Sequence, residues 1–205
     1  GLALASLGLF FGYYSGADPG ENPGLAFRVY LCVYPFLLAT AGTGGTYYPV
    51  GVAIATLISV RLEPTTGIAM SAISSAGSGE NIRLMREGEA AFSILQGLFG
   101  AYAATGSGPL AEDGAQENIR SITGLWPNVE HFAIRSSFVN TGTMADLVAM
   151  EGRTFAIGAR NSGTEGSNRQ LLSGLGVEDA DSYYDLAFIG YDPSVDAFLN
   201  GQLDA

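Results

Sequence analysis

The sequence contains no lysine, one cysteine and one histidine among its 205 residues. Without lysine it can form no P-loop, no Schiff base and no Ser-Lys dyad. The single cysteine, Cys32, excludes an intrachain disulfide and a zinc site built from thiolates. The single histidine, His131, excludes metal sites with several histidines and disfavours a catalytic triad. These absences exclude much of enzyme and metal chemistry. We expect a protein that is not an enzyme and that needs no cofactor or metal, and we keep an α/β enzyme as an alternative.

Basic residues are few as well, since nine arginines stand against twenty acidic residues and the net charge is −11. A surface that binds nucleic acid needs a basic patch, so the charge argues against a nucleic-acid partner. Residues 111–205 hold fourteen of the acidic residues. We interpret this excess as a solvated surface. Apolar residues make up 47% of the chain, which is enough for one large domain or two small ones with a packed core.

The first residues are apolar and uncharged. Gly1–Tyr14 reads GLALASLGLFFGYY, and a linker rich in Gly, Pro and Asp follows at Ser15–Gly24. We interpret residues 1–24 as the remainder of a signal peptide or membrane anchor with its linker; the alternative is a buried helix of the domain. Cys32 lies in the next apolar run, where we expect a small core residue.

Hydrophobic runs alternate with Gly-rich turns and helical patterns in residues 25–125. The expected strands are Phe36–Thr40, Ile68–Ser74 and Ala91–Leu95, and the expected helices are Val50–Leu62 and Glu80–Glu87. A βαβαβ order of this kind predicts a parallel sheet with helices on its faces.

The second half repeats this order without an exact repeat of sequence. The expected strands are Ile119–Leu125, His131–Arg135, Thr154–Gly158 and Leu186–Gly190; the expected helices are Met144–Met150 capped by Thr143, Glu165–Leu175, and a helix from Asp192 as its cap to Asn200. We therefore expect an α/β protein with two units, residues 25–125 and 126–205.

Three loops each follow a strand and open a helix, and each is rich in Gly, Ser, Thr or Asn: Gly42–Tyr48, Ala76–Asn81 and Asn161–Thr164. Ligands bind beside such loops at the carboxyl ends of parallel strands. Free N–H groups at a helix N-terminus favour an anion, and Gly lets a ligand approach the backbone. The three loops together predict capture of a carboxylate by neutral donors, although each loop alone would fit ordinary turn and cap chemistry.

Other motifs are incomplete. Gly42-Thr43-Gly44 begins a dinucleotide fingerprint, but Tyr47 stands where the last Gly is required, and there is no GxSxG. We expect His131 to be structural or part of a hinge. Tyr47 and Tyr48 fit either core aromatics or ligand contacts. Gln96 closes a strand, and its amide needs partners, of which a ligand is one candidate.

Several stretches resemble the solute-binding subunit of TRAP transporters of the TAXI type. They are ATAGTGGTYYPVG (Ala39–Gly51), SGEN with IRLMREGEAAFSILQ (Ser78–Gln96), IGARNSGTEGS (Ile157–Ser167) and FLNGQLDA (Phe198–Ala205). These bacterial proteins have the two-lobed type II periplasmic-binding-protein fold. Because the chains of that family continue beyond the last of these stretches, the second lobe and the return crossover would be incomplete here.

The resemblance implies an extracytoplasmic monomer that closes on glutamate or a related dicarboxylate and delivers it to a membrane permease. By matched position, the ligand-binding residues would be Thr43, Gly45, Thr46, Tyr47, Tyr48, Ser78, Asn81, Gln96, Ser162, Gly163 and Thr164. Gly97 and Leu98 depart from the family, which often has a small polar residue and then Asp after the strand-end Gln. The alternatives are a ligand-sensing domain of a membrane receptor, and an α/β enzyme or nucleotide-binding domain.

Overall fold

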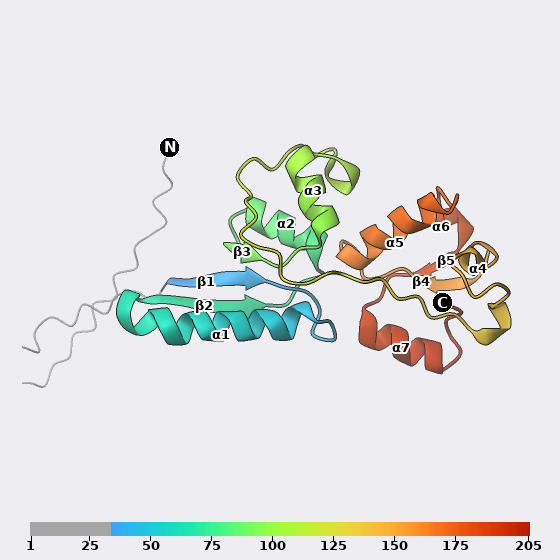
Figure 1. Ribbon diagram of the computed structural model, residues 1–205, viewed down its shortest axis with the longest axis horizontal. Coiled ribbons are helices and arrows are strands. Elements are labelled where there is room, and N and C mark those ends of the chain that lie inside the picture. Colours follow the sequence, from blue (N-terminus) through green and yellow to red (C-terminus); the bar gives the residue numbers. More distant parts are fainter. Residues whose placement is uncertain (1–33) are drawn as a thin grey trace, which may run out of the picture.

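A computed structural model gives the structure of residues 34–205. It contains two parallel sheets (Figure 1). The first sheet has the order β2-β1-β3, with β1 at Tyr34–Ala39, β2 at Ile68–Ile73 and β3 at Phe92–Ser93; the second pairs β4, Thr154–Ala156, with β5, Asp185–Ala187. The parallel βαβαβ arrangement expected for the first half is confirmed. The expectations for residues 1–24 and for Cys32 lie outside the described residues.

Helices cover both faces of each sheet (Figure 1). Around the first sheet they are α1 (Tyr47–Thr66), α2 (Ser78–Arg86) and α3 (Gly97–Thr105), followed by the 3₁₀ turn η1 (Gly108–Leu110). Around the second they are the 3₁₀ turn η2 (Ser136–Phe138) and the helices α4 (Ala145–Val148), α5 (Gly163–Gly174), α6 (Ala180–Tyr183) and α7 (Tyr191–Leu199). Within residues 34–205, no helix combines the length and the hydrophobicity that crossing a membrane requires.

The first sheet is buried on both faces, as its apolar strands require. Leu38, Met70 and Ile94 pack with Ala55 of α1 on one face. Ala39 packs with Leu84 and Ala90 on the other. Helix α1 comes very close to β1, because a Cβ atom on Gly51 would lie 2.3 Å from the Thr40 methyl group.

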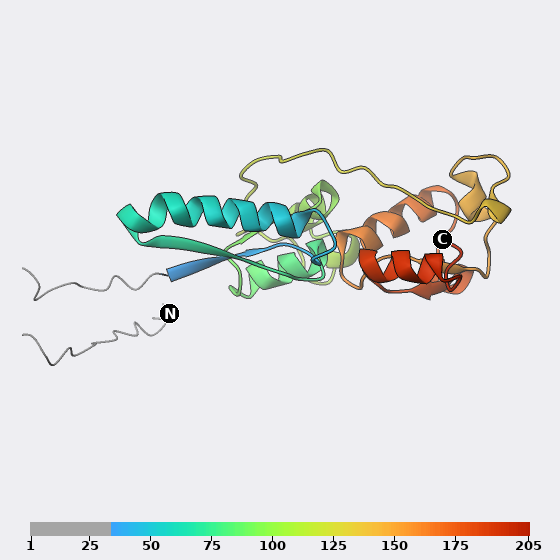
Figure 2. The same ribbon diagram turned by 90° about the horizontal axis from the view of Figure 1, so that it is seen from below.

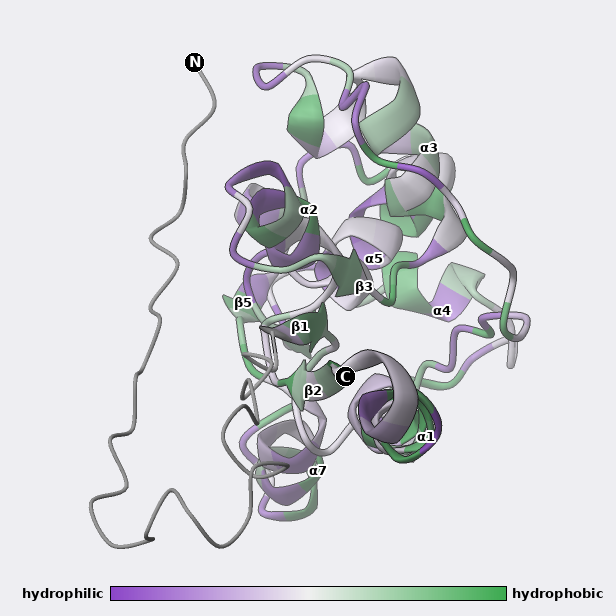
Figure 3. Cartoon of the chain, turned by 90° about the vertical axis from the view of Figure 1, so that its left-hand side faces the viewer, coloured by the Kyte–Doolittle hydropathy of each residue, from purple (hydrophilic) through white to green (hydrophobic). Residues whose placement is uncertain are grey.

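Helix α1 is apolar on most of its circumference (Figure 3). Its inner side meets the sheet, whereas Leu57 is 58% exposed and Val60 is 66% exposed. The helix begins three residues before and ends four residues after the expected Val50–Leu62. Pro64 lies in its last turn, and the helix ends at Gly67, whose left-handed backbone is a common C-terminal stop.

The second sheet has its own core. Its most buried members are Ile157, Leu172, Met150, Leu147 and Phe155. The last residues of the sequence lie along β4, where the Ala156 N–H donates to the Ala205 carbonyl at 2.9 Å. The expected helix Glu165–Leu175 is confirmed within two residues, and α3 and α6 had not been expected.

A long extended segment, residues 117–135, joins the two sheets (Figure 2). The predicted strands Ile119–Leu125 and His131–Arg135 are wrong. Among residues 120–135 backbone hydrogen bonds form at Arg135 alone, whose N–H donates to the Asp204 carbonyl at 3.1 Å and whose carbonyl accepts from the Phe138 N–H at 2.9 Å. An apolar, β-branched run becomes a strand only where a neighbouring strand offers a ladder, and this segment passes between the sheets.

Two of the predicted helix caps are displaced by a residue or two. Gly190 is the N-cap of α7, and Asp192 lies in its first turn instead of capping it. Met144 is the N-cap of α4, although Thr143 Oγ1 still accepts from the Ala145 N–H at 3.3 Å.

Candidate functional site

A cavity of about 710 Å³ lies between the two sheets, against the loops at the carboxyl ends of their strands. Trp126 and residues 128–133 of the joining segment also line it. Nine of the eleven predicted ligand-binding residues line this cavity: Thr43, Gly45, Thr46, Tyr47, Ser78, Gln96, Ser162, Gly163 and Thr164. Tyr48 and Asn81 lie outside the lining. The three loops that the sequence singled out therefore meet at one place.

The first loop carries the chain from β1 into α1. A turn closes it, with the Gly45 N–H donating to the Gly42 carbonyl at 3.0 Å. The side chain of Thr46, the N-cap, makes no capping hydrogen bond. First-turn N–H groups without an internal partner favour an anion, and α1 is 20 residues long.

Tyr47 lies on the cavity side of α1 and Tyr48 does not. The Tyr47 ring meets Trp126 of the joining segment edge to face, with centroids 5.8 Å apart. Burial, aided by Tyr191 and the charge of Glu130, raises the pKa of Tyr47 to about 12. Its hydroxyl therefore stays protonated and can donate to a ligand.

The second loop leads from β2 into α2 and turns through Gly77, whose φ of 123° favours glycine. Ser78 is fully buried, and its Oγ accepts from the Gln96 N–H at 3.0 Å. This bond fixes Gln96, the N-cap of α3, against the start of α2, so that Ser78 and Gln96 reach the cavity together.

Asn81 holds strand ends together behind the cavity wall. It is fully buried, and its Nδ2 donates to the carbonyls of Thr40 at 2.6 Å and Ile94 at 2.9 Å. Its Oδ1 accepts from Ser75 Oγ at 2.6 Å. The residue that sequence reasoning placed among the ligand contacts thus uses its amide to position the first two loops.

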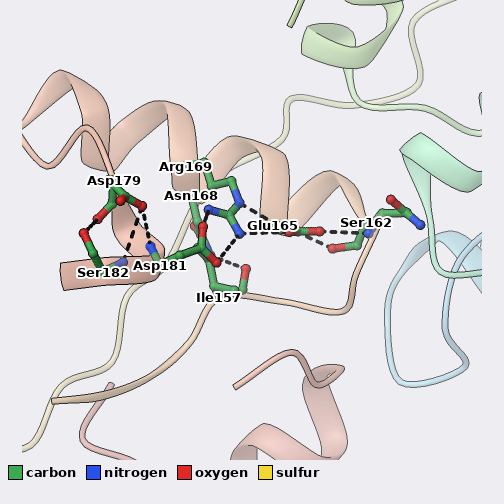
Figure 4. A network of polar contacts seen from close by, with 9 residues as sticks. Ile157, Ser162, Glu165, Asn168, Arg169, Asp179, Asp181 and Ser182 are labelled. Atoms are coloured by element: carbon green, nitrogen blue, oxygen red, sulfur yellow. Dashed lines mark hydrogen bonds and ion pairs between the residues drawn. The ribbon is translucent and has the colours of Figure 1, made fainter. Parts of the chain in front are cut away.

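The third loop leads from β4 into α5 and begins the helix with a capping box. Ser162 Oγ accepts from the Glu165 N–H at 3.0 Å (Figure 4). The acid of this capping box reaches one residue beyond the N-cap, because Glu165 Oε2 accepts from the Asn161 N–H at 2.8 Å. Arg169 then joins Glu165 to Asp181, at 3.2 Å and 2.6 Å (Figure 4). Ser162 therefore serves the helix as well as the cavity.

Thr164 and Tyr191 close the far side of the cavity, with their hydroxyl oxygens 2.8 Å apart. Both residues line it, and Tyr191 lies at the start of α7. An ideal Cβ on Gly45 would lie 3.1 Å from the Tyr191 ring. The first loop therefore packs closely against the start of α7.

Gln96 is nine-tenths buried and makes a single side-chain hydrogen bond, from Nε2 to Glu130 Oε1 at 3.3 Å. Its Oε1 is buried without a partner. Glu130 also accepts from Asn128 Nδ2 at 3.1 Å. Both of these donors are neutral.

The charges around the cavity are acidic. Glu130 and Asp192 line it, and within residues 34–205 no arginine does. His131 lines it as well, beside Glu130 in the joining segment. Within residues 34–205, no group of three or more His, Cys, Asp or Glu side chains is placed to hold a metal ion.

Glycines bring the parts of the chain around the two sheets into contact. An added Cβ would meet a group across the junction at 2.5–2.8 Å at four positions: Gly44 against the Asp192 carboxylate, Gly79 against the Asn161 carbonyl, Gly163 against Gln96 and Ser78, and Gly166 against the Phe99 ring. The junction therefore depends on the absence of side chains.

The sequence did not indicate that Glu130, Tyr191 and Asp192 line the cavity. One signal for Glu130 was available, because it is the only charged residue between Arg120 and Arg135. For Tyr191 and Asp192 the helix-start pattern suggested only a cap, and nothing in the pattern indicates that this helix turns towards the first loop.

The sequence model of the NMT1-like family matches residues 38–205, which include both sheets and all three loops. A mixed α/β structure with parallel sheets is consistent with a periplasmic-binding-like fold. Proteins of such families are typically extracytoplasmic. The chain belongs to the NMT1-like family of periplasmic solute-binding proteins.

Proposed function

We propose that this protein is an extracytoplasmic solute-binding protein of the TAXI type, which binds a small carboxylate and delivers it to a TRAP-type membrane permease. The observation that carries the proposal is the convergence of three helix-opening loops on one cavity of about 710 Å³. The loops come from different sheets, as a protein that encloses its ligand requires.

The carboxylate would lie at the first loop. The unpaired N–H groups at the start of α1 and the hydroxyls of Thr43 and Thr46 are neutral donors that suit an anion. The GTGGTYYP sequence of the same loop is the most specific part of the resemblance to the TAXI subunits. Glutamate and related dicarboxylates are the ligands that this resemblance suggests.

The proposed mechanism is closure of two lobes around the ligand, with no bond made or broken. Contacts from loops on both sides would favour the closed state in proportion to the difference in affinity between the two states. The permease would then recognise the closed state of a monomer. The glycine contacts across the junction support this mechanism, because they let the two sheets and their surrounding helices approach each other closely.

A thermal-shift screen tests the proposal. The panel contains glutamate, glutamine, 2-oxoglutarate, succinate and malate at one pH. A ligand present at about 100 times its dissociation constant adds about 2.7 kcal/mol to the free energy of unfolding. We expect a clear shift with at least one of these compounds.

Two matched variants locate the binding. Thr43→Val removes a donor from the cavity, and Thr65→Val makes the same change in the last turn of α1, where Thr65 bonds only to Leu62. The first should reduce the shift and the second should not. If no compound stabilises the protein, or if both variants behave alike, carboxylate binding at the first loop is wrong.

A further inference from the structure

The amide of Gln96 has a defined orientation. A carboxylate only accepts hydrogen bonds, so Glu130 requires the Nε2 group of Gln96 to face it. The opposite orientation would place two acceptors against each other. Gln96 Oε1 is therefore directed away from Glu130, and it is buried without a donor.

A buried acceptor without a donor is costly, so it indicates a missing partner. Gln96 lines the cavity, and the group that covers Oε1 is Gly163, whose added Cβ would lie 2.8 Å from it. Gly163 belongs to the second sheet's loop. Separation of the two loops would open the path from the cavity to this oxygen.

Glu130 places a negative charge beside this acceptor. Its hydrogen-bond partners are the neutral amides of Gln96 and Asn128, and within residues 34–205 it forms no ion pair. No arginine is among the described residues that line the cavity, and the sequence contains no lysine. Glu130 and Tyr47 of the first loop line the same cavity, and the charge of Glu130 contributes to the raised pKa of Tyr47.

A ligand with two carboxylates would meet this uncompensated charge. One carboxylate at the first loop would find neutral donors, but the second would find Glu130 or Asp192 and no cation. A ligand with one carboxylate and one protonated amine instead has a donor for Gln96 Oε1 and a positive charge for Glu130.

We infer that Glu130 and Gln96 Oε1 form a subsite for the protonated amine of the ligand, which makes the ligand an amino acid rather than a dicarboxylate or an oxo acid. This inference rests on the proposed function, because it takes the carboxylate to lie at the first loop. It adds a second, oppositely charged end to the site.

Pairs of compounds that differ only in the amine test the subsite. L-glutamine is compared with 2-oxoglutaramate and L-alanine with pyruvate, since these compounds have a single carboxylate, and L-glutamate is compared with 2-oxoglutarate, all by titration calorimetry on the same chain. A charge-assisted hydrogen bond to a buried group corresponds to roughly tenfold to hundredfold in affinity. We expect at least one amino acid to bind about tenfold or more tightly than its amine-free partner.

Variants then assign the preference to its residues. Glu130→Gln keeps the shape and removes the charge, and Gln96→Met removes the amide oxygen. Asp196→Asn is the matched control, since Asp196 lies in α7 but not in the cavity lining. Glu130→Gln should weaken amino-acid binding about tenfold or more, leave the oxo acid unchanged or tighter, and preserve the unliganded melting temperature. Gln96→Met should also lower the ratio of the affinity for the amino acid to the affinity for its amine-free partner, and Asp196→Asn should leave this ratio unchanged.

The outcomes separate the two proposals. Binding of oxo acids or dicarboxylates as tightly as amino acids overturns the amine subsite and leaves the proposed function standing. Equal losses for both compound classes in Glu130→Gln also overturn it. Stabilisation by sodium or magnesium chloride alone, abolished in Glu130→Gln, would assign the site to a metal cation instead. Failure of every compound to bind overturns both proposals.

Discussion

Phe99 and Gly166 are in direct contact across the junction between the two sheets: a Cβ atom at position 166 would lie 2.5 Å from the Phe99 ring. Phe99 comes from α3 and Gly166 from α5. Neither residue lines the cavity. The pair therefore influences how closely the two parts approach without touching a ligand.

Gly166→Ala should hold the two parts further apart. The ring of Phe99 is nearly fully buried and has little room to move, and overpacking of this kind costs about 1–3 kcal/mol. We expect the affinity for the ligand to fall about tenfold and the radius of gyration of the liganded protein, measured by X-ray scattering, to increase.

Gly174→Ala is the control, because it changes the same helix where an added Cβ meets nothing within 4 Å. This substitution should leave both the affinity and the radius of gyration as they are. An unaltered affinity in Gly166→Ala would show that this contact does not limit the closed state.

Asn81→Leu should destabilise the protein by about 3 kcal/mol. The substitution leaves the buried carbonyls of Thr40 and Ile94 without their donor, and each buried unpaired group costs about 1–3 kcal/mol. Urea unfolding measures the change. Asn118→Leu, at an exposed position, should change the free energy of unfolding little, and a small effect at both positions would contradict the structural role of Asn81.

Asp146 should make the stability sensitive to acid. Burial of its carboxyl group opposes ionisation, but hydrogen bonds from Thr141, Gly142 and Asn140 outweigh burial and lower its pKa. A carboxyl whose pKa is lowered by folding stabilises the protein above its unfolded pKa, near 4, and this contribution is lost as the pH falls through the folded pKa.

The free energy of unfolding should therefore decrease as the pH falls below about 4. Asp146→Asn should be less stable than the unchanged protein at neutral pH. Its free energy of unfolding should also decrease less as the pH falls below about 4. Asp196→Asn, an exposed control, should follow the unchanged protein. Parallel pH profiles for the protein and Asp146→Asn would refute the assignment.

Ser162→Ala should remove the cap of α5 and lower the free energy of unfolding by about 1 kcal/mol. Ser173→Ala, near the other end of the helix, should cost only a few tenths of a kcal/mol, because its bond to Glu178 is exposed. Thermal unfolding of the two variants measures both changes in the free energy of unfolding. Equal effects would indicate that the capping box contributes nothing measurable.

The sequence predicted the first sheet and the three loops because local patterns determine both. Apolar runs such as Ile68–Ile73 need a buried sheet, and Gly-rich turns before helices mark the ends of its strands. The extended segment of residues 117–135 was mistaken for strands, because strand formation depends on a neighbour that the local pattern does not contain.

The candidate site was predictable to the same extent. The loops could be placed, but the role of each side chain depends on which group lies opposite. Asn81 resembles a ligand contact until Thr40 and Ile94 are seen beside its amide. Glu130 resembles a solvent-exposed acid until the amide of Gln96 is seen beside it.

Each sheet is assembled from a contiguous stretch of chain. The strands of the first sheet lie within residues 34–93, and those of the second within residues 154–187. Contacts between nearby residues form early, and domains generally fold as units during synthesis from the N-terminal end. The first sheet can therefore fold while the second is still being synthesised, and the cavity between them forms only after the second sheet has folded.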